Sequence, residues 1–158
     1  MANTQSMCTS FMGELMTATQ NFGTAPIRAA TTADTFKGAL YLASATYNAS
    51  TTAYSATGEV SGTNYTAGGV TVTNATAPTA TNSSATAGVA YWTPSASLTY
   101  SNVTLSTAFD AVLIYNNTNS NRAVSVHTFG SQTITAGTFT LTMPSNTTST
   151  ALLRLSTT

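Results

Sequence analysis

The sequence predicts an all-β fold, either an antiparallel β-sandwich or a small jelly-roll-like barrel, with one α-helix at its N-terminus. Short runs rich in β-branched and aromatic residues recur along the 158-residue chain, and Gly, Pro, Asn or Ser bounds each run. The segments that connect these runs are too short for a helical crossover, so neighbouring strands are expected to be antiparallel. A chain of this length is expected to form about one domain.

The N-terminal segment has the spacing of an amphipathic helix over about residues 5–19. Its apolar residues form two adjoining stripes along the helix. The first contains Met7, Phe11, Leu15 and Ala18, and the second contains Cys8, Met12 and Met16. Gly23 and Pro26 end the element. The stripe either covers an opening of the core or docks onto a partner, and both interpretations stay open. We expect residues 1–25 to be an N-terminal helical segment whose candidate role is docking, and residues 26–158 to be a single β-sandwich domain.

Beyond the N-terminal segment the apolar period becomes two residues, which is typical of a strand. In residues 35–42 (TFKGALYL), Phe36 and Leu40 fall on one face and Lys37 on the other, which predicts a half-buried strand. Similar runs lie at residues 69–73, 88–92, 98–105, 110–115, 122–129, 138–143 and 151–156. The run at 110–115 (DAVLIY) is apolar throughout, so we expect a central strand that is covered on both faces.

Two connections rich in Asn, Ser and Thr are typical of hairpin turns. Residues 116–121 (NNTNSN) join two neighbouring runs, and residues 144–149 (PSNTTS) join the last two runs of the chain. The stretch between Ser44 and Gly69 is long, irregular and rich in Thr and Ala. We expect this stretch to cross the surface of the domain.

Charged residues make up only 5% of the chain, with four Lys plus Arg, four Asp plus Glu and a formal net charge of zero. Four cations offset by four anions form no basic patch, so nucleic acid binding is not expected. Net charge keeps protein molecules apart by repulsion, and this chain has none. The composition therefore favours a structural or interaction protein that packs closely against copies of itself.

Candidate catalytic and metal-binding groups are sparse. His127 and Asp110 fall on neighbouring predicted strands, but no G-x-S-x-G motif selects a serine to complete a hydrolase triad. His127 is therefore interpreted as a structural hydrogen-bonding residue, and Asp110 is expected to pair with Arg122 across the hairpin. Cys8 is interpreted as a small buried hydrophobic residue. The scattered carboxylates match no metal-ligand spacing, so we expect no metal, no cofactor and no enzymatic activity.

The chain has seven tyrosines and Trp92, and these aromatic residues allow two interpretations. The first is that they wall the core while their hydroxyl groups reach its rim, and the second is a shelf that binds sugars. The tyrosines of the irregular stretch are candidate partner contacts, together with the apolar stripe of the helix. The full set is Met7, Phe11, Met12, Leu15, Met16, Tyr47, Tyr54 and Tyr65.

The first 22 residues lack a basic region and a continuous apolar run, so we expect neither a secretory signal nor a membrane-spanning helix. This pattern predicts synthesis in a cytoplasm without contact with a membrane. Release by lysis, as a virus component, is consistent with it.

Four segments resemble a set of small tailed-bacteriophage virion proteins. They are TFKGALYLASATYNASTTAYSATG at 35–58, EVSGTNYTAGG at 59–69, AVLIYNNTNSNRAV at 111–124 and GTFTLTMPSNTTSTALLRL at 137–155. The resemblance implies a structural role in the virion, formed in the cytoplasm of a bacterial host, with no catalytic residues to carry over.

We expect a capsid decoration or cement protein that binds the shell of the major capsid protein and associates with itself. A neck, collar, adaptor or tail-fibre-base protein is the alternative within the virion. A module that recognises host glycans through exposed tyrosines and residues 116–121 is a more distant alternative.

Overall fold

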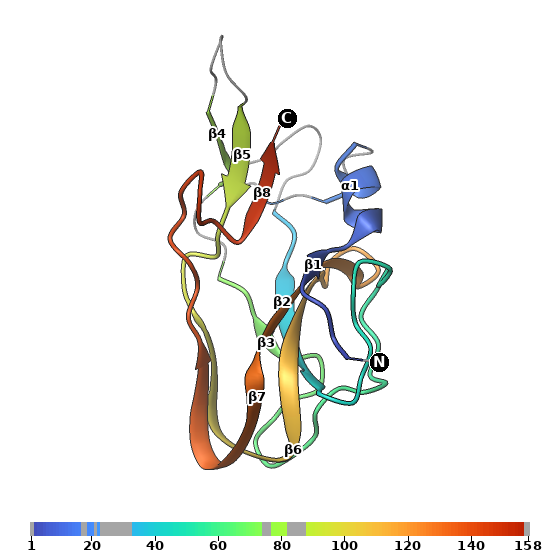
Figure 1. Ribbon diagram of the computed structural model, residues 1–158, viewed down its shortest axis with the longest axis vertical. Coiled ribbons are helices and arrows are strands. Elements are labelled where there is room, and N and C mark those ends of the chain that lie inside the picture. Colours follow the sequence, from blue (N-terminus) through green and yellow to red (C-terminus); the bar gives the residue numbers. More distant parts are fainter. Residues whose placement is uncertain are drawn as a thin grey trace.

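The structure is a computed structural model that describes residues 2–16, 19, 20, 22, 33–73, 77–81 and 88–156. It shows an all-β protein with two antiparallel sheets and one short helix (Figure 1). The expected fold class is therefore confirmed. The elements are β1 (Ser6–Met7), α1 (Thr9–Met16), β2 (Phe36–Leu42), β3 (Val70–Thr71), β4 (Thr79–Ala80), β5 (Val89–Trp92), β6 (Leu98–Asn116), β7 (Arg122–Leu141) and β8 (Leu153–Ser156). The larger sheet has the order β1-β7-β6-β2-β3 and the smaller one β4-β5-β8.

The long hairpin of β6 and β7 builds much of the molecule. The turn at 116–121 joins these strands as expected, but each strand merges two runs that the sequence pattern separates. In Figure 1 the hairpin bends back on itself at the bottom of the view, so its two halves stand beside each other. Shifts in register accompany the bend, and Asn102 and Ala136 have positive φ angles there. Such bulges are the usual means of bending a strand pair sharply.

The two halves of the hairpin enclose the core of the sandwich. Tyr100, on the first part of β6, donates a hydrogen bond of 2.8 Å to the carbonyl oxygen of Gly38 on β2. The rings of Phe109 and Phe139 meet edge to face at 5.2 Å. A Cβ atom on Gly38 would lie 2.6 Å from Cδ1 of Leu98, so glycine is what permits β2 and the first part of β6 to approach so closely.

β2 is buried on both faces, so the prediction of a half-buried strand was wrong. Tyr41, on the face expected to be exposed, is completely buried. The irregular stretch covers this face: the rings of Tyr47 and Tyr41 lie 3.7 Å apart, and Tyr54 stacks on Tyr115. The stretch thus crosses the sheet as expected and forms an additional layer over it. Residues 111–116 of β6 are buried throughout, which confirms the prediction of a doubly covered strand.

The helix begins later than predicted because a strand precedes it. β1 pairs with Ser125 and Val126 on the edge of β7, and α1 follows directly. Cys8 is completely buried, as expected, and its amide donates to the carbonyl oxygen of Val124 over 3.0 Å. Burial raises the pKa of the Cys8 thiol to about 12. Ala18, Gly23 and Pro26, which the helix prediction invoked, lie outside the described residues.

The smaller sheet corrects the second hairpin prediction. β8 pairs with β5, with Leu153 opposite Trp92, and does not pair with β7. Residues 144–149 therefore carry the chain from one sheet to the other. Trp92 and Leu153 are both buried, so this pairing covers the end of the core with apolar side chains.

Candidate interaction surfaces

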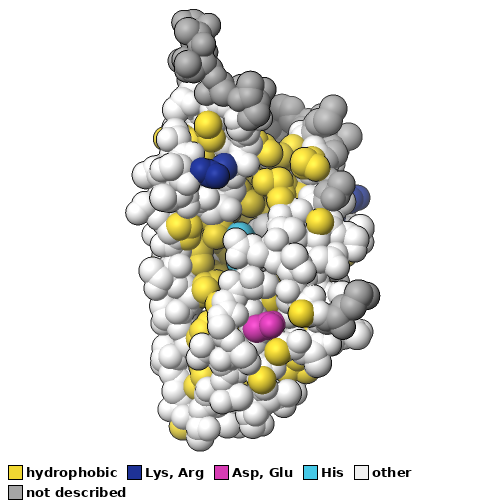
Figure 2. Space-filling model, in the orientation of Figure 1, with side chains coloured by type: hydrophobic (Ala, Val, Ile, Leu, Met, Phe, Trp, Pro, Cys, Tyr) yellow, Lys and Arg dark blue, Asp and Glu magenta, His cyan; other side chains and the backbone are white. Residues whose placement is uncertain are grey.

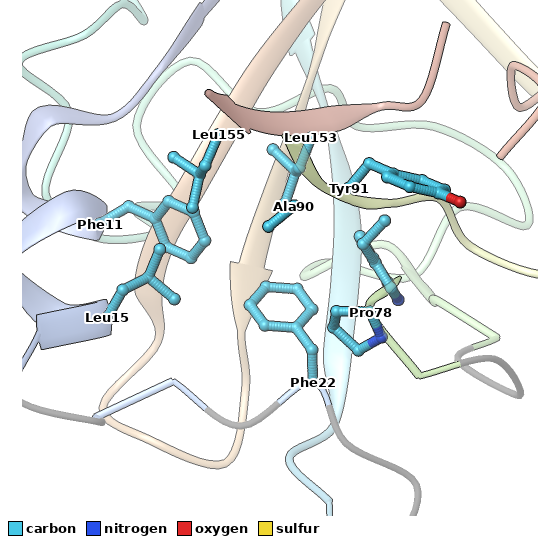
Figure 3. A pocket seen from close by; sticks show the side chains of 9 residues that line it. Phe11, Leu15, Phe22, Pro78, Ala90, Tyr91, Leu153 and Leu155 are labelled. Atoms are coloured by element: carbon cyan, nitrogen blue, oxygen red, sulfur yellow. The ribbon is translucent and has the colours of Figure 1, made fainter. Parts of the chain in front are cut away.

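An apolar groove of about 70 Å³ lies between α1 and the smaller sheet (Figure 3). The side chains that line it are all apolar or aromatic: Phe11, Leu15, Phe22, Pro78, Ala90, Tyr91, Trp92, Leu153 and Leu155. Its floor belongs to the aromatic core, since Phe22 stacks on Phe36 at 4.2 Å and meets Trp92 edge to face at 4.7 Å. Figure 2 shows a patch of hydrophobic side chains on this part of the surface.

The most exposed large hydrophobic side chains of the described residues lie on the two elements that flank this groove. Met12 on α1 is 48% exposed and Leu155 on β8 is 39% exposed. On the same helix Phe11 is buried, whereas Leu15 is half-buried and lines the groove. One helix therefore contributes side chains to the core and to the surface.

The other two candidate partner contacts of the predicted helix are Met7 and Met16. Met7 is half-buried on β1 and packs against the core, outside the helix. The side chain of Met16 lies outside the described part of the structure.

An ion pair holds α1 against the hairpin. Arg122, at the start of β7, lies 2.9 Å from a carboxylate oxygen of Glu14, whose side chain is only 9% exposed. The expected pairing of Asp110 with Arg122 was therefore wrong. Arg122 lies opposite Asn116 in the strand register, far along β6 from Asp110. The carboxylate of Asp110 instead accepts a hydrogen bond of 2.6 Å from the side-chain amide of Asn3.

The three candidate tyrosines direct their hydroxyl groups into the fold. Tyr54 and Tyr65 donate hydrogen bonds of 2.7 and 2.8 Å to the two carboxylate oxygens of Glu59. The amide of Gly68 donates to the same carboxylate over 2.7 Å. Tyr47 hydrogen-bonds to the backbone carbonyl oxygens of the irregular stretch. Burial, reinforced by the nearby Glu59, raises the pKa values of the Tyr54 and Tyr65 hydroxyls above their usual range.

Glu59 organises the irregular stretch, and the sequence interpretation missed this role. The only local signal is that Glu59 is one of four acidic residues in the chain and lies among tyrosines.

His127 makes a side-chain hydrogen bond, as expected. Its Nε2 atom lies 2.8 Å from the hydroxyl of Ser125, two residues earlier on β7. Burial lowers the pKa of His127 to about 4, so the imidazole is neutral at pH 7.

A polar groove of about 410 Å³ lies beside β3, where residues 64–71 face residues 99–101 of β6. Most of the residues that line it carry a hydroxyl or amide group, although more of its exposed lining surface is apolar than polar. Tyr65 and Tyr100 lie with nearly parallel rings 6.0 Å apart.

The outer edge of β7 is a further surface. β1 pairs with only two of its residues, and among the described strands no other lies on that side. Figure 2 shows hydrophobic side chains along a hollow left of its centre, in the region where Figure 1 shows the two halves of the hairpin side by side.

No family model matches the chain, and no curated protein or solved structure is detectably similar to it. Within the described residues, no helix is long and apolar enough to cross a membrane, and no group of three or more His, Cys, Asp or Glu residues is placed to hold a metal ion.

Proposed function

We propose that this protein is a structural subunit of a tailed-bacteriophage particle that decorates the head, where it binds the shell of the major capsid protein and neighbouring copies of itself. Support comes from the resemblance of four segments to virion proteins and from a composition with 5% charged residues. Such a subunit makes its contacts by packing and by hydrogen bonds of neutral groups, which salt screens little.

The apolar groove beside α1 is the observation that carries this proposal. Met12 and Leu155 offer a partner exposed apolar area on the elements that flank a preformed depression. Apolar patches bordered by polar surface are typical of protein interaction sites. The virion shell is the partner that we propose for this end of the molecule.

The head is favoured over the neck or tail because the fold is a short sandwich. The described residues contain no extended shaft of the kind that fibres need. The copy number in the particle distinguishes the two placements, since a ring at the neck holds far fewer subunits than a shell.

Cosedimentation with capsids that lack this protein tests the docking surface. We expect the wild-type protein to sediment with the capsids, and the double variant Met12→Asp and Leu155→Asp to lose binding about tenfold or more, because charges would be desolvated in an apolar contact. Ser61→Asp adds a charge at an exposed position outside the groove and serves as the control. Unchanged binding of the double variant, with circular dichroism confirming that it is folded, would contradict the proposed docking surface.

Recognition of a neutral glycan is a second candidate function, and the polar groove beside β3 favours it. Sugars are bound by hydroxyl and amide groups next to aromatic rings, and this groove offers both. Ser101→Trp is expected to fill the groove and abolish any binding on a glycan array. An array without signal for the wild-type protein would remove this candidate.

A further inference from the structure

The end of the second half of β7 presents a regular strand edge to solvent. From Leu141 to Phe139 this half pairs with Leu98 to Tyr100 without any shift in register, so its backbone here has ordinary strand geometry. β1 covers β7 only at Ser125 and Val126. The backbone N–H and C=O groups on the outer side therefore lack a neighbouring strand within the described sheet. Such an edge is a template for pairing with another strand.

Residues that prevent edge pairing are missing here. Natural edge strands carry charges, above all Lys, or Pro within the strand. From Thr128 to Leu153 the sequence has no charged residue, and its single proline, Pro144, follows the regular segment. Proline has no N–H group, so it marks where pairing ends. The segment that remains available is residues 138–143 (TFTLTM), the last four residues of β7 and the two that follow the strand, which we call the open edge.

The side chains of the open edge alternate in the way that a paired strand requires. Thr138, Thr140 and Thr142 are exposed, whereas Phe139, Leu141 and Met143 are half-buried against the core. The ring of Phe139 lies 5.1 Å from that of Phe129 and 6.0 Å from that of Tyr100. A strand added at this edge would cover the exposed part of this apolar row and extend the core across the contact.

We infer that two copies of this chain join through their open edges, as antiparallel strands related by a two-fold axis, so that their sheets become continuous. This inference deepens the proposed function and rests on its self-association.

A second copy fits this edge best because the edge is complementary to itself. Two-fold pairing sets a threonine row against a threonine row and an apolar row against an apolar row. Because neither partner carries charge along this segment, nothing repels the approach. Cross-strand Thr–Thr and aromatic pairs are among those that stabilise antiparallel strands.

The opposite side of the hairpin, formed by the first part of β6, is less suited to pairing with a second copy. On that side the amide of Thr104 on β6 donates to the carbonyl oxygen of Thr63, so the irregular stretch already covers part of the strand.

Sedimentation equilibrium of the full chain tests the inference. We expect a monomer–dimer equilibrium whose dissociation constant changes little with salt, because no ion pair crosses the contact. The double variant Thr138→Lys and Thr140→Lys adds charges at exposed positions of the open edge, and its dissociation constant should rise about tenfold or more.

Thr99→Lys is the matched control, because Thr99 is exposed and lies directly opposite Thr140 in the same strand pair. We expect it to leave the dimer intact. An equal loss of dimer in Thr99→Lys, or an unchanged dimer in the double variant, would overturn the assignment to the open edge and leave the proposed function standing.

Hydrogen exchange provides a readout that does not depend on a variant. The backbone amides of residues 138–143 should exchange more slowly at concentrations above the dissociation constant than at concentrations below it. Equal exchange at both concentrations would overturn the inference. A wild-type protein that is monomeric at every concentration would contradict both the inference and the self-association of the proposed function, whereas capsid binding is measured separately.

Discussion

Glu59 shows how one carboxylate can order a segment without regular secondary structure. It accepts hydrogen bonds from Tyr54, Tyr65 and the amide of Gly68, which come from different parts of the irregular stretch. Hydrogen bonds to charged groups contribute more to stability than those between neutral groups. We interpret this network as what holds a Thr- and Ala-rich segment together over the sheet.

Removing one donor from this network should destabilise the fold. Tyr54→Phe deletes the hydroxyl that hydrogen-bonds to Glu59 and keeps the ring that stacks on Tyr115, so the free energy of unfolding should fall by about 1–3 kcal/mol. Urea denaturation measures this change. Tyr91→Phe is the control, because Tyr91 makes none of the hydrogen bonds to Glu59. Equal stability of the Tyr54 and Tyr91 variants would show that the network is unimportant.

His127 predicts a pH dependence of stability. Burial lowers its pKa to about 4 in the folded protein, against an ordinary value of 6.5. Between these two values the unfolded chain binds a proton that the folded protein does not, so stability falls as the pH falls from 6.5 to 4. A shift of this size corresponds to about 3 kcal/mol.

The variant His127→Gln isolates this contribution. Urea denaturation of both proteins at pH 7 and pH 4 should show a smaller loss of stability in the variant, because it cannot bind the proton. All other groups are the same in both proteins, so their contributions cancel in the comparison. If both proteins lose the same stability over this range, His127 is not the group responsible.

Gly38 governs how closely β2 approaches the first part of β6. A Cβ atom there would meet Leu98 at 2.6 Å, so Gly38→Ala should force the layers apart and cost about 1–3 kcal/mol of stability. Gly130→Ala on β7 is the control, because its nearest neighbour would lie 4.0 Å from the added atom. Thermal or urea unfolding of both variants compares them. A Gly38 variant as stable as the Gly130 variant would mean that the layers have room to adjust.

Local strand patterns were predictable because alternation and turn residues are local properties. The runs at 36–42, 89–92 and 153–156, and the turn at 116–121, appear in the structure close to their expected positions. The continuity of β6 was not predictable. Ser106 and Thr107 interrupt the apolar pattern between its two runs, whereas the backbone pairing continues through shifts in register.

Pairing between distant segments was also beyond the sequence pattern. Periodicity does not say which strand lies beside β8, so its pairing with β5 was missed. For the same reason, the sequence pattern predicted only the part of the apolar groove that the helix contributes. Phe11 and Leu15 follow from the helical stripe, but Leu155 joins them only through the packing of two elements far apart in the chain.

The molecule as a whole has two kinds of surface that suit an assembly. The apolar groove lies between α1 and the smaller sheet, and the open edge runs along the late part of β7 in the larger sheet. One surface for a partner and another for a second copy would let a subunit bind a shell and its neighbours together. A net charge of zero allows such subunits to lie close together.

We propose that this chain is a repeated structural part of a virus particle. Quantitative mass spectrometry of phage particles purified from cells that produce this chain is the decisive experiment. We predict that the chain remains with the particles through washing at high salt, in a copy number comparable with that of the major capsid protein. Purified particles that lack the chain would rule out this role.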